Sequence, residues 1–251
     1  MAKSYYSGQG SLYMAERDAT TGKPKGFVAV GNIPELTLDI EISKFEHKES
    51  ESGDRLLDLT LITEKKGKFN FKLESMSLAN LTIGLFGESA TVALGNVVDE
   101  AVTARLGKRV ALAHPDVSSV VVKDAATGLV TYVLNDDYTV DAKNGVLIFP
   151  TTPADIVADQ ALEVSYSHAA YDNLEAFTTA VAPERYMRFE GLNTVDGTRV
   201  IIDLPRAQFD PLTGYGLINE ELGSITMAGS LLADEFITSG SKFMRQRNIA
   251  A

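Results

Sequence analysis

The chain has 251 residues, 45% of them hydrophobic, which is enough for one large β domain or for a core with a smaller module. It contains no cysteine, which excludes disulfides and thiolate metal sites. The formal net charge of −11 argues against tight binding to a phosphate backbone, because such binding needs clustered Lys and Arg. The acidity is concentrated in residues 88–175, with 13 Asp+Glu against 5 Lys+Arg. It indicates either solubility or a surface that does not adhere to DNA.

The sequence shows no membrane or export signal. The first ten residues, MAKSYYSGQG, lack the apolar stretch of a secretory signal, and no run approaches the roughly 20 apolar residues of a membrane-spanning helix. We therefore expect a protein that folds in a reducing cytoplasm and does not insert into a membrane.

An alternating segment over residues 33–43 predicts the first strand. Apolar and polar side chains take turns along it: Leu36, Leu38, Ile40 and Ile42 against Glu35, Thr37, Asp39 and Glu41. The pattern is typical of a half-buried strand with an acidic outer face.

A charged segment at residues 44–55 predicts a long loop, because it is too polar for burial and too long for a tight turn. Two interpretations stay open: a solvated loop, or an arm that pairs with complementary charges on a neighbouring subunit. In the second interpretation the arm would make the contact between stacked rings. Its candidate contact residues are Lys44, Phe45, Glu46, His47, Lys48, Glu49, Glu51, Asp54 and Arg55.

Two more strands are predicted at residues 56–63 and 68–74, joined by a hairpin turn at residues 64–67. The first has leucines on one face and Asp58 on the other, and the second sets phenylalanines against Lys68 and Lys72. A short helix follows over residues 76–86, with Ser75 as its N-cap and Gly87 at its end.

The remaining chain predicts an inserted module and a return to the first domain. Short strand-like runs separated by turn signals indicate an antiparallel β module. They lie at residues 109–113, 119–123, 130–134, 139–140, 146–149 and 162–167. The last third predicts strands at residues 185–190, 198–204 and 222–232, a turn at 193–197, an irregular stretch at 205–215 and a polar, basic tail from 239. We expect a core domain of residues 1–87 and 176–251, with residues 88–175 inserted.

No catalytic or metal-binding constellation stands out. His47, His114 and His168 have no partner at metal-ligand spacing, and we expect them to be surface histidines. Gly8-Gln9-Gly10 lacks the third glycine of a dinucleotide fingerprint, and the sequence has neither a P-loop nor a nucleophile elbow. Asp136 and Asp137 suit a turn better than a calcium loop. The sequence therefore predicts no enzymatic activity, no cofactor and no metal.

Several short segments, taken in order, carry a family resemblance that covers nearly the whole chain. They are Tyr6-Ser7-Gly8-Gln9-Gly10-Ser11-Leu12-Tyr13, Gly31-Asn32 with Leu36-Thr37-Leu38, the Glu-rich stretch before Asp54-Arg55, Asn80-Leu81 with Leu85-Phe86-Gly87, Asp137-Tyr138-Thr139-Val140-Asp141 with Gly145, and Arg188-Phe189-Glu190-Gly191-Leu192-Asn193. In this order they resemble the major tail tube protein of long-tailed, siphovirus-like bacteriophages.

The resemblance implies a β-sandwich or barrel core with a flanking helix and an inserted small β module. It also implies rings, expected to be hexameric, that stack into a tube and conduct genomic DNA into the host. The implied partners are further copies of the chain, the tail terminator, the tape measure, the baseplate or tip proteins, and DNA in transit without specific binding. The implied location is the virion tail, assembled in the bacterial cytoplasm.

Two structural hypotheses follow, and two other functions stay open. The candidate lumen-facing residues are Glu35, Asp39, Glu41, Asp58, Lys68 and Lys72, and the inserted module is expected to face outward, because it could not fit a channel of DNA width. The main alternative is a β-sandwich binding or adhesion module for carbohydrate or protein. The second alternative is another phage tail component, such as a tail terminator or a contractile inner tube.

Overall fold

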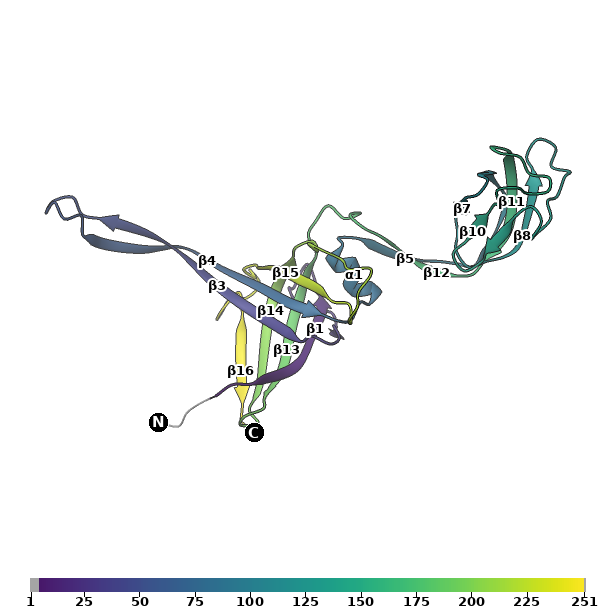
Figure 1. Cartoon of the computed structure of the whole chain (residues 1–251). Coiled ribbons are helices and arrows are strands. Elements are labelled where there is room, and N and C mark those ends of the chain that lie inside the picture. The colour runs from purple at the N-terminus through teal and green to yellow at the C-terminus, as the bar shows by residue number, and fades with distance from the viewer. Residues whose placement is uncertain (1–4, 251) are drawn as a thin grey trace. The chain divides into compact units, whose positions relative to one another are not determined.

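A computed structural model describes residues 5–250, which form a mainly β protein, as the sequence predicted (Figure 1). The chain divides into two compact units, Met1–Ser89 with Leu174–Ala251, and Ala90–Asn173. These limits lie within two residues of the expected domain boundaries. Within residues 5–250 no helix is long and apolar enough to cross a membrane, and α1 has seven residues.

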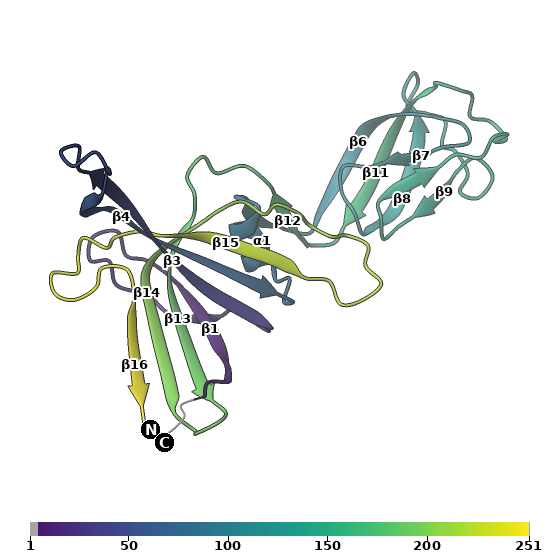
Figure 2. The ribbon, with the colours of Figure 1, turned by 60° about the vertical axis from the view of Figure 1, so that its left-hand side comes forward.

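The first unit is built on one antiparallel sheet in the order β2-β1-β13-β14-β15-β4-β3, with β16 also paired to β14. β14 pairs with β16 through Arg199–Asp203 and with β15 through Ala207–Phe209, so it belongs to both halves of the sheet. Figure 2 shows one half of the sheet, β15, β4 and β3, crossing over the other half, β1, β13 and β14. The elements are β1 (Gly8–Glu16), β2 (Val28–Ala29), β3 (Glu35–Lys48), β4 (Leu57–Leu73), α1 (Leu78–Gly84), β13 (Glu184–Asn193), β14 (Arg199–Phe209), β15 (Ile225–Leu231) and β16 (Arg245–Ile249).

The core of this unit lies between the two halves of the sheet and α1. Its centre is aromatic: the rings of Phe69 and Phe209 meet edge to face with centroids 5.0 Å apart, beside the buried Phe71. The N-cap of α1 is Ser77, whose hydroxyl accepts a hydrogen bond from the backbone amide of Asn80, and not the predicted cap Ser75. Leu81 and Ile83 of α1 are both buried in this core.

The predicted turn at residues 64–67 is wrong. β4 runs through it without a break and pairs with β3 from Glu35↔Lys72 to Lys48↔Leu57. The turn-like residues instead have cross-strand partners, since Lys66 lies opposite Glu41, and Gly67 packs under Leu231 of β15. The predicted loop is wrong for residues 44–48, which belong to β3. The loop is confined to residues 49–56.

Other predicted boundaries also change. The turn at residues 193–197 is confirmed by hydrogen bonds from the amides of Asn193 and Gly197. β14 continues to Phe209 through Pro205, which is tolerated beside an irregularity in the pairing with β13. Six strands were not predicted, namely β1, β2 and β16 in this unit and β5 (Glu88–Val92), β6 (Gly95–Thr103) and β12 (Tyr171–Glu175) in the inserted region. The strand predicted at residues 130–134 forms only isolated bridges.

The second unit holds two three-stranded antiparallel sheets, β6-β11-β8 and β7-β10-β9. They enclose a separate core that includes Val122, Leu147, Phe149 and Leu162. A two-stranded ribbon of β5 and β12 spans the division between the units. The strands are β5 (Glu88–Val92), β6 (Gly95–Thr103), β7 (Arg109–Ala111), β8 (Val117–Asp124), β9 (Thr139–Asp141), β10 (Val146–Ile148), β11 (Ala161–His168) and β12 (Tyr171–Glu175).

Candidate functional site

The most prominent feature of the first unit is the hairpin of β3 and β4, which extends away from the rest of the unit (Figure 1). β15 pairs with β4 only over Gly67–Leu73. Beyond that point the hairpin is two strands wide. We call residues 41–66 the distal hairpin and the paired segments 35–40 and 67–72 the proximal hairpin. Two strands alone are at best marginally stable in water, so the distal hairpin lacks the packing that fixes the proximal one.

The polar face of the proximal hairpin carries both charge signs. Glu35 lies opposite Lys72, and Asp39 lies opposite Lys68. The Lys68 ammonium also lies 2.9 Å from a carboxylate oxygen of Glu41. The acidic strand and the lysine-bearing strand therefore form one face of mixed charge and not an acidic wall.

Of the candidate lumen residues, Asp58 lies apart from the others. It is on the distal hairpin, where its carboxylate oxygen is 2.6 Å from His47 Nδ1. The structure thus brings together Glu35, Asp39, Glu41, Lys68 and Lys72, and places Asp58 with the candidate contact residues of the arm.

The distal hairpin exposes large apolar side chains on both of its faces. Directly opposite residues share a face, so Phe45 and Leu61 form a pair, and they are 52% and 50% exposed. Ile42 points to the other face, as does Ile40 at the end of the proximal hairpin, because side chains alternate along the unbroken strand β3. Ile62, opposite Lys44, shares that second face.

These apolar pairs are unusual for a ribbon surrounded by water. A soluble monomer normally buries such a cluster, and large exposed apolar patches mark interaction sites. With both faces apolar, the distal hairpin can contact two surfaces at once. Its exposed apolar side chains therefore make it a candidate interaction surface.

The tip of the hairpin is held by one carboxylate. Glu49 accepts hydrogen bonds from the Ser52 hydroxyl and from the amides of Ser52 and Glu51, at 2.9 and 2.6 Å for the amides. These bonds, above all the one from the Ser52 hydroxyl, lower the pKa of Glu49 to about 2. The Glu49 amide also donates to the Leu56 carbonyl at 2.8 Å, which closes the loop. The tip is an ordered turn whose candidate contact residues Glu51, Asp54 and Arg55 lie in water.

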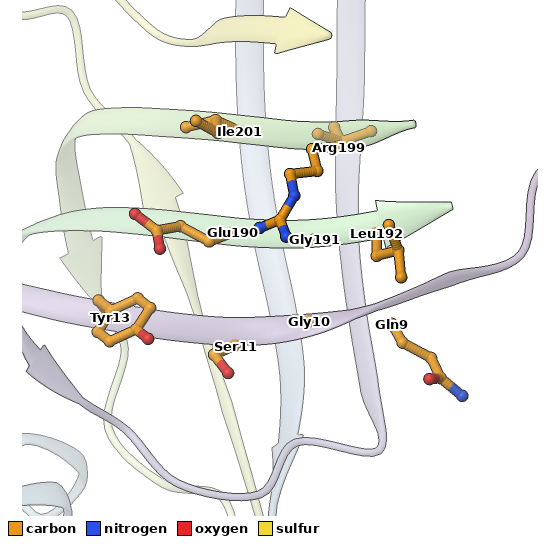
Figure 3. A pocket seen from close by; sticks show the side chains of 10 residues that line it. Gln9, Gly10, Ser11, Tyr13, Glu190, Gly191, Leu192, Arg199 and Ile201 are labelled. Atoms are coloured by element: carbon orange, nitrogen blue, oxygen red, sulfur yellow. The ribbon is translucent and has the colours of Figure 1, made fainter. Parts of the chain in front are cut away.

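A shallow hollow of about 410 Å³ lies on the outer face of β1, β13 and β14. Figure 3 shows the Arg199 side chain reaching from β14 across Gly191, with Glu190 and Leu192 on either side. The Glu190 carboxylate is 2.7 Å from Arg188, so it is already paired. The hollow thus offers one guanidinium and no pairing of a nucleophile with a base among its lining residues.

The second unit brings two of the predicted surface histidines together. The rings of His114 and His168 stack with centroids 4.0 Å apart, and the Tyr171 hydroxyl is 3.0 Å from His114 Nδ1. His168 is buried, contrary to expectation. Residues 5–250 contain no group of three or more metal-binding side chains. The histidines lie 54 residues apart in sequence, so spacing alone could not reveal the pair.

Comparison with known families assigns the chain to a family. Residues 5–247 match the model described as "Protein of unknown function UCP028589", and the chain belongs to that family. A search of the curated proteins found no match. The family extends over both units, so the inserted module is part of the family's architecture.

Proposed function

We propose that this chain is the major tail tube protein of a long-tailed bacteriophage: a structural protein, not an enzyme, that polymerises into stacked rings around a DNA channel. The observation that carries the proposal is the distal hairpin, with apolar residues exposed on both faces. An isolated protein gains nothing from such an element, whereas a copy in a tube can contact neighbours on both sides of it.

The ends of the sheet support the same proposal. β3 is the last strand in the sheet order, and β1 pairs with β2 only through Tyr13 and Met14. Strand direction alternates along the path from β1 to β3, so β3 of one copy could pair antiparallel with the outer edge of β1 in the next. Repeating that contact around a ring would satisfy both open edges.

The channel wall is proposed to include the mixed polar face of the proximal hairpin. Its paired charges leave little net field, so passing DNA would meet neither a strong attraction nor a strong repulsion. The hexameric ring, the outward-facing module, the virion-tail location and the contacts with tail terminator, tape measure and baseplate proteins all stay predictions of this proposal.

Assembly of the purified protein tests the proposal. Sedimentation and negative-stain microscopy should show tubes with a central channel above a threshold concentration. A variant in which a two-residue Asn-Gly turn replaces residues 44–63, which keeps the Ser43–Glu64 pair, should remain folded and stay monomeric. Tubes formed equally well by this variant would contradict the role of the distal hairpin, and a wild-type protein that stays monomeric at all concentrations would contradict the proposed function.

A further inference from the structure

A second apolar surface lies on the first unit, away from the hairpin. It is a groove of about 490 Å³ between α1 and the strands β1 and β2, within the size range of natural binding pockets, about 300–1,000 Å³. Its apolar lining includes Met14, Val28, Val30 and Ile83. Val28 is 70% exposed, so the groove is open to a ligand of aliphatic character.

The charged residues of this groove are mainly basic. Lys25 and Arg185 line it together with one acid, Glu16. The Lys25 ammonium is 3.7 Å from Glu16 and both side chains are largely exposed, so this pair is weak. Arg185 donates one hydrogen bond to the Glu184 carbonyl. The groove is therefore apolar inside, with a small excess of positive charge.

The same unit carries an exposed segment of matching chemistry between β14 and β15. Leu217 and Ile218 are 78% and 97% exposed, and Glu220 and Glu221 follow them after Asn219. No Lys or Arg occurs between Arg206 and Lys242. The segment is therefore largely apolar, and its charged residues are all acidic. We call residues 215–222 the Leu-Ile loop.

The base of this loop is fixed on the unit. Leu212 donates its amide to the Gly84 carbonyl at 2.8 Å, and its side chain fills the space beside Gly84, where an added Cβ would lie 2.7 Å from it. The Asn219 side-chain amide donates to the Gly216 carbonyl at 3.2 Å, which shapes the loop itself. The loop therefore presents its two aliphatic side chains from a defined position at the end of α1.

We infer that the Leu-Ile loop of one copy docks into the α1–β2 groove of the next. Leu217 and Ile218 would enter the apolar lining, and Glu220 and Glu221 would face Lys25 and Arg185. The inference rests on the proposed self-assembly and names a contact within it. These opposite charges would steer the two copies toward each other and set their relative orientation, more than they would increase the binding affinity.

This contact joins two different patches of the same chain. Such a heterologous contact generates a closed ring or an open filament, and not a symmetric dimer. The distal hairpin is a less suitable occupant of the groove, because it carries charges of both signs beside its apolar pairs. The charged residues of the loop are all acidic, so the loop better complements the small positive excess of the groove.

A cross-linking experiment tests the contact. Because the chain has no native cysteine, only the introduced cysteines can form disulfides. The double variant Val28→Cys/Ile218→Cys, assembled and then oxidised, should give a ladder of disulfide-linked oligomers on a non-reducing gel. Each single variant should give no species larger than a dimer. The matched control is Leu129→Cys/Ile218→Cys, since Leu129 is an exposed aliphatic residue of the second unit, and it should give no ladder.

A second variant measures the same contact without cysteine. Leu217→Ser/Ile218→Ser should raise the assembly threshold at least about tenfold, whereas the surface control Leu129→Ser should leave it unchanged. Tubes that form without any Val28–Ile218 ladder, or with a cross-link inside each monomer, would overturn the inference and leave the tube proposal standing. A wild-type protein that never assembles would overturn both.

Discussion

The proximal and distal parts of one hairpin have similar sequences and different environments. Along β4, Phe69 and Phe71 alternate with polar residues just as Leu59 and Leu61 do. The phenylalanines are fully buried in the core, where β4 pairs with β15, whereas Leu59 and Leu61 are 47% and 50% exposed. Alternation therefore shows which residues share a face, and only the neighbouring elements decide whether that face is covered. The uncovered part marks where we expect other copies of the chain to bind.

The largest effect on stability should come from the proximal part. Phe71→Ala removes a fully buried ring that contacts the Phe209 ring, and should lower the free energy of unfolding by about 3–5 kcal/mol. Leu61→Ala in the distal part should change it by less than about 0.5 kcal/mol, because that side chain is half exposed. Urea denaturation of the monomer measures both. Equal losses would show that the distal hairpin packs within its own chain.

The largest effect on assembly should come from the distal part. Phe45→Ser/Leu61→Ser removes the apolar pair of one face and should raise the threshold concentration for tubes at least about tenfold, with little change in monomer stability. Leu129→Ser is the matched control, since it also removes an exposed aliphatic side chain. Sedimentation across a concentration series measures the threshold. An unchanged threshold would mean that this face makes no contact.

The charged proximal face should affect DNA transit more than assembly. Glu35→Lys/Asp39→Lys/Glu41→Lys places new lysines opposite Lys72, Lys68 and Lys66, at a cost on the order of 0.2–1 kcal/mol for each pair. Tubes should still form, and particles built from them should eject DNA more slowly, because a basic wall attracts phosphates. Ejection kinetics provide the measurement, and unaltered kinetics would remove this face from the channel wall.

The smallest effect concerns the tip. The pKa of Glu49 is lowered to about 2, so its carboxylate stabilises the tip above its ordinary pKa of 4.5, and this contribution is lost as the pH falls through about 2. NMR titration of the Glu49 carboxyl carbon should show that low midpoint, and Ser52→Ala should raise it. A midpoint at the ordinary value in the wild type would mean that the Ser52 bonds do not form in solution.

Part of the fold was predictable because it depends on local pattern. The alternation of Leu36 and Leu38 predicted a strand, and the turn at residues 193–197 was predicted from its polar and glycine residues. Lys65-Lys66-Gly67 has the composition of a turn but lies within β4, because long-range pairing with β3 outweighs local preference. β16 was missed, since its polar sequence shows no apolar alternation and it is fixed by pairing with β14.

The candidate site was predicted as a set of residues and not as a geometry. The sequence identified the charged residues of the arm and of the polar faces, but it could not show which residues of the acidic strand and the lysine strand lie opposite each other. Register shows that they face each other, as with Asp39 and Lys68. The exposed apolar pairs of the distal hairpin were missed as well, because exposure depends on where β15 ends.

The central claim is that the distal hairpin is a contact between copies of the chain. A cryo-EM map of the assembled protein tests it most directly. The account predicts tubes in which density from neighbouring copies covers both faces of the distal hairpin, over Phe45 and Leu61 on one side and over Ile42 and Ile62 on the other. A tube in which both faces of the distal hairpin are surrounded by solvent would contradict it.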